Sequence, residues 1–267
     1  MDRYRIKPGK RVRLADWDPS DKRGFKHGKA EAEKRLDKLR DDLVELQEVL
    51  YAEGRHRLLI VLQGMDPSGK DGLIRRIFQG VNPQGVRVVS FKTPSSAELA
   101  RDYLWRVHQQ VPGRGEIVIF NRSHYEDVLI VRVHELVPKS VWRRRYDQIA
   151  DFERLLAEEG TTILKFFLHI SLEEQKVGFE ERLADPTKIW KFNPNDLKER
   201  ARWPEYMRAY EDAIARTSTD CAPWYVVPAD RKWFRDLLIA ETLVGTLKKL
   251  KMKYPQPDFD PAAIRID

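Results

Sequence analysis

The sequence predicts an α/β fold in which helices sandwich a parallel five-stranded sheet. Five short apolar runs, each typical of a buried strand, alternate with longer stretches of helical pattern. The first run leads into a glycine-bracketed loop and then into a helix, as expected for a parallel sheet. Strands that alternate with helices pair in parallel and are covered on both faces. We expect the five strands at 58–63, 86–91, 117–121, 162–169 and 224–227.

The segment before the first strand has two parts. Residues 1–29 are basic, contain Gly and Pro and show no steady apolar period, which predicts an irregular arm. From 30 to 51, leucines recur at alternating steps of three and four, the stripe of an amphipathic helix. This helix is expected to pack on the core, although a subunit contact and hence a homo-oligomer stay open. We therefore divide the chain into an arm and helix (1–54), a core (55–254) and a C-terminal tail (255–267).

The loop after the first strand has the GxxxxGK pattern of a phosphate-binding loop. Backbone N–H groups of such a loop surround phosphate oxygens, the next helix adds its positive N-terminal end, and the lysine adds a cation. The flanking strand and helix disfavour the alternative of a simple glycine turn with a surface lysine. Phosphoryl chemistry is therefore the leading hypothesis. The predicted phosphate-binding residues here are Gly64, Met65, Pro67, Ser68, Gly69 and Asp71, and Lys70 is predicted to be catalytic.

Two carboxylates are candidate metal ligands. Asp66 lies inside the loop and would repel a phosphate unless a cation, Mg²⁺ or alternatively Mn²⁺, sits between them. Asp71 replaces the Ser or Thr that commonly binds this metal through a hydroxyl. Asp127, after the third strand, is the predicted second carboxylate, and its alternative interpretation is a first-turn acid that stabilises a helix dipole.

Further candidate residues follow the other strands, whose carboxyl ends meet at one edge of the sheet. Lys92 follows the second strand and is predicted to bind phosphate. Arg122 follows the third and is predicted to bind the transferred phosphoryl group, with a surface ion pair as the alternative. Neither His124 nor His169 is needed as a nucleophile, and each is expected to be a hydrogen-bonded structural histidine.

Cations are concentrated between about 178 and 210, which predicts a mobile cationic lid. A closing lid would neutralise phosphate charge and exclude water, a competing phosphoryl acceptor. Arg182, as a catalytic residue, and Lys188 and Lys191, as phosphate ligands, are the lid residues that we predict to act. The run 143–145 adds three arginines, for which a functional role and a solvated helix face stay equally open.

Charge and composition limit the partners. The 267-residue chain has a formal charge of +7, which favours anionic partners such as nucleotides, polyphosphate or nucleic acid. Its single cysteine, Cys221, excludes an internal disulfide and a multi-cysteine metal cluster. The sequence has neither a secretory segment nor an apolar run of membrane length, so we expect no membrane partner and a cytoplasmic location.

Three segments together resemble the polyphosphate kinase 2 family: GMDPSGKDG (64–72), FNRSHYEDV (120–128) and ERLADPTKIWKF (181–192). The resemblance runs over roughly 16–250. It implies a P-loop kinase core with a helical lid that moves phosphoryl groups between inorganic polyphosphate and nucleotides with Mg²⁺. It also implies that Asp66 and Asp127 bind metal, that Lys70 is the loop lysine, and that Arg122 and the lid cations bind phosphate.

The segment 16–26 looks most like class III members, which phosphorylate both AMP and ADP. We therefore expect direct, reversible transfer of the terminal phosphoryl group of polyphosphate to these adenine nucleotides. Asn121 and Glu126 are the expected nucleotide contacts, and Glu126 is a candidate acceptor for an exocyclic amino group. The alternatives are a nucleoside monophosphate kinase that uses ATP and, much less favoured, a non-catalytic nucleic-acid-binding protein whose aromatics would be Trp105, Trp142, Trp190 and Trp203.

Overall fold

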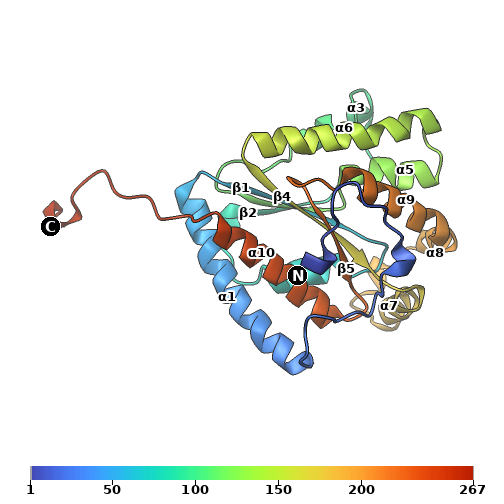
Figure 1. Ribbon diagram of the computed structural model, residues 1–267, viewed down its shortest axis with the longest axis horizontal. Coiled ribbons are helices and arrows are strands. Elements are labelled where there is room, and N and C mark those ends of the chain that lie inside the picture. Colours follow the sequence, from blue (N-terminus) through green and yellow to red (C-terminus); the bar gives the residue numbers. More distant parts are fainter. Residues whose placement is uncertain (1, 267) are drawn as a thin grey trace.

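The computed structural model describes residues 2–266 and contains one five-stranded parallel sheet in the order β2-β3-β1-β4-β5 (Figure 1). The predicted fold class is therefore confirmed. The predicted second strand is two residues too long, because pairing with β3 ends at Val89. The strands are β1 (Arg57–Gln63), β2 (Val86–Val89), β3 (Ile117–Asn121), β4 (Thr161–His169) and β5 (Trp224–Pro228).

Helices cover both faces of the sheet because successive side chains of a strand point to opposite faces. In β1, Leu58 and Ile60 pack with α1 (Lys29–Glu53), α2 (Lys70–Ile77) and α10 (Lys232–Lys249). Leu59 and Val61 pack on the opposite face with α6 (Lys139–Glu158) and α9 (Trp203–Thr217). This two-sided burial explains why the strands read as continuous apolar runs.

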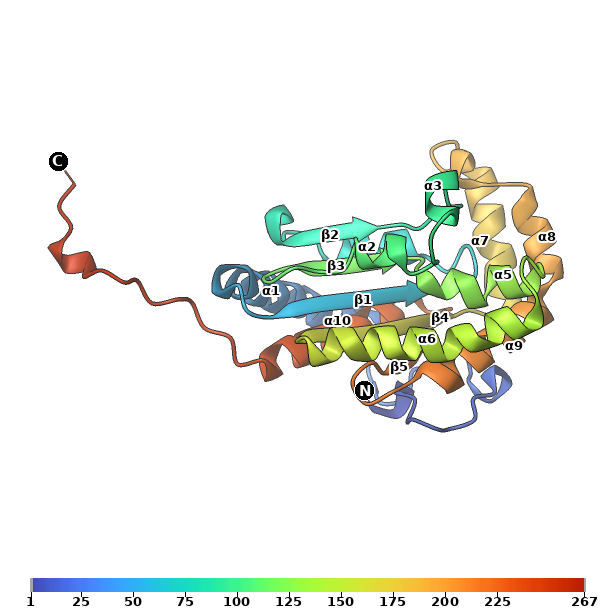
Figure 2. The same ribbon diagram turned by 90° about the horizontal axis from the view of Figure 1, so that it is seen from above.

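The shorter helices gather mainly at the carboxyl ends of the strands. Figure 2 shows α5, α7 and α8 beyond the arrowheads of the sheet. The predicted lid region, about 178–210, includes α8 and parts of α7 and α9, and it therefore lies at this edge of the sheet. The remaining helices are α3 (Ser96–Leu99), α4 (Trp105–His108), α5 (Ile130–Val133), α7 (Leu172–Ala184) and α8 (Asn195–Ala201), and the 3₁₀ turns used below are η4 (His124–Val128) and η5 (Ile189–Lys191).

The leucine stripe of α1 faces the core. Leu36, Leu43 and Leu50 are buried, and they pack in the cluster that includes α10. Core packing therefore accounts for the stripe, and a homo-oligomer remains a prediction. Within residues 2–266 no helix is both long and apolar enough to cross a bilayer.

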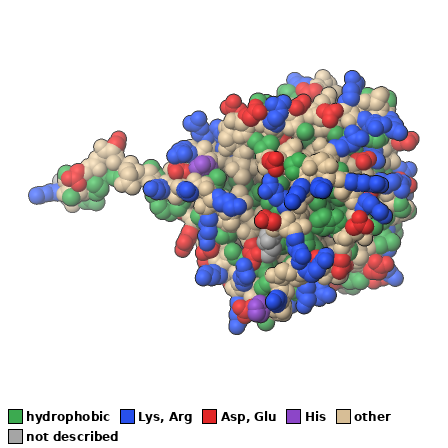
Figure 3. Space-filling view, viewed as in Figure 1, with side chains coloured by type: hydrophobic (Ala, Val, Ile, Leu, Met, Phe, Trp, Pro, Cys, Tyr) green, Lys and Arg blue, Asp and Glu red, His purple; other side chains and the backbone are tan. Residues whose placement is uncertain are grey.

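The two ends of the chain behave differently. Residues 253–266 are exposed and extend away from the body as a tail (Figures 1 and 3). The N-terminal arm, in contrast, packs along β5: the Ile6 N–H donates to the Trp224 carbonyl at 2.8 Å, and Tyr4 and Leu14 are buried. Within residues 2–28 the arm contains only two 3₁₀ turns and one isolated bridge, as its irregular sequence predicts.

His169 joins the arm to the end of β4, and this contact predicts a pH dependence of stability. Its Nε2 lies 3.1 Å from the Trp17 carbonyl oxygen, whereas Nδ1 is buried and has no hydrogen-bond partner among the described residues. Burial lowers the pKa of His169 below its ordinary 6.5. Below pH 6.5 the unfolded chain therefore binds a proton more readily than the folded chain, and stability is lost as the pH falls. Melting temperatures between pH 8 and 5.5 should decline less steeply for His169→Asn than for the unmodified protein, and equal slopes would contradict this assignment.

Candidate active site

The loop between β1 and α2 is shaped by two glycines. A Cβ on Gly64, whose φ is +156°, would lie 2.8 Å from both the Leu168 carbonyl oxygen and the Ser68 hydroxyl. Gly69 has a φ of +83° and faces the guanidinium of Arg235 too closely to accept a side chain. Both positions therefore require glycine, and the loop closes tightly against its surroundings.

Lys70 points back into this loop. Its ammonium donates to the Gly64 carbonyl at 2.7 Å and to the Asp66 carboxylate at 3.1 Å, and the residue is only 6% exposed. Beneath the loop, the buried Arg235 donates to the Ser68 carbonyl at 2.9 Å. Two cations thus lie at the loop, which favours binding of an anion there.

Asp66 lies between two cations. Although burial opposes its ionisation, Lys70 and Arg122 hold the pKa of the Asp66 carboxyl well below its usual range. Arg122 donates directly to this carboxylate. Its backbone has a φ of +67°, a left-handed conformation that costs energy in a non-glycine residue and is common at functional sites.

Two cavities meet at Asp66 and Arg122. One, of about 530 Å³, is lined by three of the nine predicted phosphate-binding residues together with Lys70 and Arg182; the other, of about 330 Å³, is lined by Glu126. Because both cavities share Asp66 and Arg122, a ligand in each would meet at these side chains. The first cavity is lined by Asp66, Lys70, Asp71, Lys92, Asn121, Arg122, Arg182 and Lys191 among others, and the second by Gly64, Met65, Asp66, Thr93, Arg122, Glu126, Gln175, Glu199, Tyr206 and Tyr210 among others.

Not all predicted lid cations reach the first cavity. Lys191 donates to the Asp71 carboxylate at 3.0 Å and so bridges η5 and α2. Arg182 donates to the Lys191 carbonyl at 3.3 Å. Lys188 instead is exposed and pairs with Asp185 at 2.6 Å. Only two of the three lid cations therefore face the cavity in this conformation.

The remaining predicted ligands take supporting positions. Asn121 donates to Asp71 at 2.8 Å and lies in the first cavity, apart from Glu126. Ser68 is buried within the loop, and Pro67 packs against Gly178 of α7, where a Cβ would come within 2.6 Å of it. Gly178 thus allows α7 to approach the phosphate loop closely.

The two adjacent acids of η4 point into different cavities. Asp127 accepts from Arg145 at 2.8 Å and lines a third cavity, of about 520 Å³, with Arg106. Burial raises the pKa of Asp127 to about 6, although Arg145 opposes this shift. Burial also raises the pKa of Glu126, which lies on the Asp66 side. Asp127 as a second metal carboxylate remains a prediction.

The donor chemistry fits a hard divalent cation. Asp66 supplies a carboxylate at the phosphate loop, and oxygen is the ligand that Mg²⁺ and Mn²⁺ prefer. Within residues 2–266 no three His, Cys, Asp or Glu side chains are grouped to hold a metal ion. Mg²⁺ commonly uses one or two carboxylates and completes its shell with substrate phosphates and water, so this arrangement suits it.

Comparison with known proteins identifies the family. The family model described as Polyphosphate kinase 2 (PPK2) matches residues 26–255. The chain belongs to the polyphosphate kinase 2 family. The resemblance on the three motifs is thereby confirmed.

Two relatives match all or nearly all of the chain. The chain is 58% identical over 267 residues to the AMP/ADP-polyphosphate phosphotransferase of Meiothermus ruber, with 100% of both chains covered. It is 44% identical over 265 residues to the ADP-polyphosphate phosphotransferase of Rhodopseudomonas palustris, with 95% of this chain and 91% of the relative covered. The crystal structure of polyphosphate kinase 2 from Arthrobacter aurescens TC1 superposes with a TM-score of 0.94 at 44% identity, covering 98% of this chain and 93% of that one.

Some residues that support the site of this polyphosphate kinase 2 chain were not predicted from the sequence. The fully buried Lys165 of β4 pairs with Glu153 of α6. The Glu153 carboxylate also accepts a hydrogen bond from the Tyr125 hydroxyl at 2.8 Å and lies 3.2 Å from His124 Nε2. These contacts fix η4 behind Glu126 and Asp127. A lysine inside an apolar strand is the sequence signal that could have indicated such a buried pair, and Arg235 in the apolar α10 is a second one.

Proposed function

We propose that the chain transfers the terminal phosphoryl group of inorganic polyphosphate to AMP and ADP, giving ADP and ATP, in a reversible reaction. The observation that carries this proposal is the pair of adjoining cavities with Arg122 and Asp66 at their junction. The cationic cavity suits a phosphate chain, and the Glu126 cavity suits the acceptor nucleotide. The names of the Meiothermus ruber and Rhodopseudomonas palustris relatives support polyphosphate and adenine nucleotides as substrates.

The transfer is a direct in-line displacement. An oxygen of the acceptor phosphate attacks the terminal phosphorus of polyphosphate, and the bridging P–O bond breaks to release a chain shortened by one phosphate. The acceptor oxygen is already anionic near neutral pH, so no base is required. Lys70 and Arg122 position the donor and neutralise charge at the junction. The one group that this chemistry adds is Mg²⁺ or Mn²⁺, which Asp66 would hold and which would neutralise phosphate charge.

Lys191 of the predicted lid should contribute binding rather than chemistry. Lys191→Ala removes the cation that joins η5 to Asp71 at the mouth of the phosphate cavity. We expect the KM for polyphosphate to rise about fivefold, since an exposed charge pair contributes up to ~1 kcal/mol. Lys188→Ala is the matched control, because its partner Asp185 lies on the lid itself. Initial rates over a range of polyphosphate concentrations measure both, and equal KM values for the two variants would refute the distinction.

Glu126 is the proposed reader of the adenine amino group. Its carboxylate lies in the smaller cavity with Tyr206 and Tyr210, and an amino group of adenine donates where guanine presents a carbonyl. Glu126→Ala should therefore reduce the ratio of kcat/KM for AMP over GMP. A ratio identical to that of the unmodified protein would exclude this role.

One assay tests the proposed function. The purified protein is incubated with Mg²⁺ and AMP, or separately ADP, with or without polyphosphate, and the nucleotides are separated by anion-exchange chromatography. ADP and ATP that grow from AMP only when polyphosphate is present support transfer to both acceptors. Transfer from ATP but not from polyphosphate would instead identify a nucleoside monophosphate kinase.

A further inference from the structure

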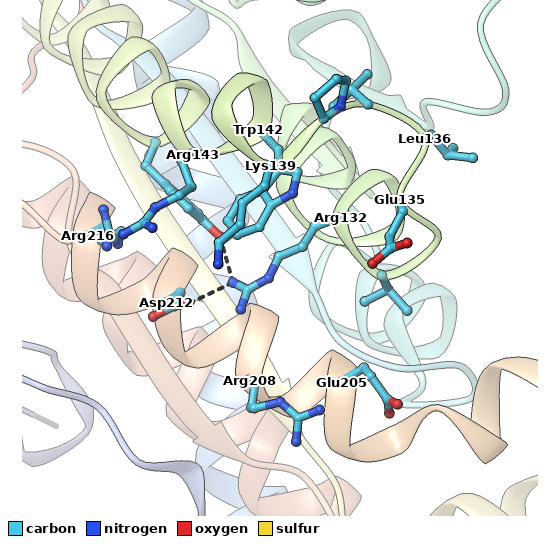
Figure 4. A pocket seen from close by; sticks show the side chains of 14 residues that line it. Arg132, Glu135, Leu136, Lys139, Trp142, Arg143, Glu205, Arg208, Asp212 and Arg216 are labelled. Atoms are coloured by element: carbon cyan, nitrogen blue, oxygen red, sulfur yellow. Dashed lines mark hydrogen bonds and ion pairs between the residues drawn. The ribbon is translucent and has the colours of Figure 1, made fainter.

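A second cationic groove lies outside the candidate active site, between the α5–α6 segment and α9 (Figure 4). Its volume is about 870 Å³, larger than either cavity at the phosphate loop. Five of its lining residues are basic and three are acidic. They are Arg132, Lys139, Arg143, Arg208 and Arg216 against Glu135, Glu205 and Asp212.

Part of this groove is rigidly built. Arg132 donates to the Tyr146 hydroxyl at 2.9 Å and to Asp212 at 2.7 Å (Figure 4). Its guanidinium lies 4.6 Å from the ring centroid of Trp142, and that of Arg216 lies 5.3 Å from the centroid of Tyr146. Arginines stacked on aromatic rings keep N–H groups available for a ligand, so two of the cations are fixed before binding.

The other feature of the groove is unneutralised charge. Lys139, Arg143, Arg208 and Arg216 make no ion pair with any acid of residues 2–266. Arg145, on the same helix, differs because it pairs with Asp127. Glu135 and Glu205 in the same groove are also unpaired among the described residues, so the groove has an excess of two positive charges, which an anion that carries several negative charges neutralises.

Helix α9 separates this groove from the candidate active site. Tyr206 and Tyr210 line the cavity of Glu126, whereas Arg208, Asp212 and Arg216 line the groove. The two sites therefore lie on different sides of one helix, whose diameter with side chains is about 10–12 Å. A long polyanion can span that distance.

We propose that this groove binds a chain of phosphates as a second site. The chain is either the distal part of a long polyphosphate, which rests on the proposed function, or the triphosphate of a free nucleotide. The three arginines at 143–145 differ in their surroundings. Arg143 lines the groove, Arg145 binds Asp127, and Arg144 lines neither the groove nor the cavity of Asp127.

That difference supplies the experiment. In Arg143→Gln/Arg216→Gln two groove cations are lost, and both side chains are exposed, so the fold is retained. The matched control, Arg144→Gln/Arg55→Gln, removes the same charge from exposed arginines that line neither the groove nor the phosphate-loop cavities. Calorimetric titration with long-chain polyphosphate, tripolyphosphate, ATP and an RNA oligonucleotide measures binding, and initial rates with the two polyphosphates measure activity.

For polyphosphate, we expect the groove variant to bind the long chain on the order of tenfold more weakly and to raise its KM similarly, with tripolyphosphate unchanged. For a nucleotide, the ATP stoichiometry should instead fall from two to one per chain. Both outcomes support a phosphate-chain site and distinguish its source. Values equal to those of the control, or loss of binding only for an RNA oligonucleotide, would overturn the proposal. If the unmodified protein transfers no phosphoryl group from either polyphosphate, the proposed function is refuted. The groove proposal is still tested in that case, because the titrations measure binding and not activity.

Discussion

Replacing Lys70 with Met should lower kcat on the order of 10³-fold while the protein stays folded. The Lys70 ammonium is the cation inside the phosphate loop, with the Gly64 carbonyl at 2.7 Å and Asp66 at 3.1 Å. Loss of one preorganised donor to a developing negative charge typically costs 10²–10³ in kcat, and Asp66 also loses a partner that lowers its pKa. The substitution keeps the length of the side chain, and Arg235 still supports the loop from below.

Lys92→Met is the matched control for this experiment. Lys92 lines the same cavity, but it is exposed and lies three residues after the end of β2 rather than inside the loop. We expect Lys92→Met to raise the KM for polyphosphate and to leave kcat within about threefold, as for the loss of a surface charge. Rates at saturating polyphosphate and melting temperatures compare the two variants. A Lys70→Met kcat close to that of Lys92→Met would show that the loop lysine only helps to bind substrate.

The strands could be predicted because each is buried on both faces. Leu58 to Leu62 are all apolar since alternate residues enter the two packed layers, and the same holds for Ile117 to Phe120. The loop was predictable because its glycines are required by geometry: Gly64 and Gly69 have φ values or neighbours that exclude other residues. Local physical requirements such as these leave a direct trace in the sequence.

The directions of the long polar side chains could not be predicted in the same way. Asp127 and Glu126 are adjacent in η4, yet they line different cavities because successive side chains of a 3₁₀ turn point in different directions. Lys188 and Lys191 are equally plausible phosphate ligands in sequence, yet one pairs with Asp185 and the other with Asp71. The Lys191 pair depends on a partner far away in the chain, which local sequence does not reveal, whereas Lys188 is held by a residue only three positions before it.

Asp127→Asn is expected to lower kcat by on the order of 10²-fold or more and to leave the melting temperature nearly unchanged. The physical basis is a half-buried carboxylate that accepts a hydrogen bond from Arg145, in a turn fixed by the Glu153 network. If Asp127 is the second metal carboxylate, the variant should also need at least tenfold more Mg²⁺ for half-maximal rate. Initial rates across a Mg²⁺ titration, with circular dichroism as a check of the fold, measure this.

Arg145→Gln separates catalysis from structure. The competing interpretation is that Asp127 only forms an ion pair with Arg145, in which case either substitution breaks the same interaction. The two single variants would then lose activity and stability to similar extents, and the double variant would lose no more than each alone. Metal binding by Asp127 predicts the opposite: Arg145→Gln frees the carboxylate and keeps most of the activity, whereas Asp127→Asn does not. The double-mutant cycle therefore decides whether Asp127, near the end of η4, acts on the substrate or only on Arg145.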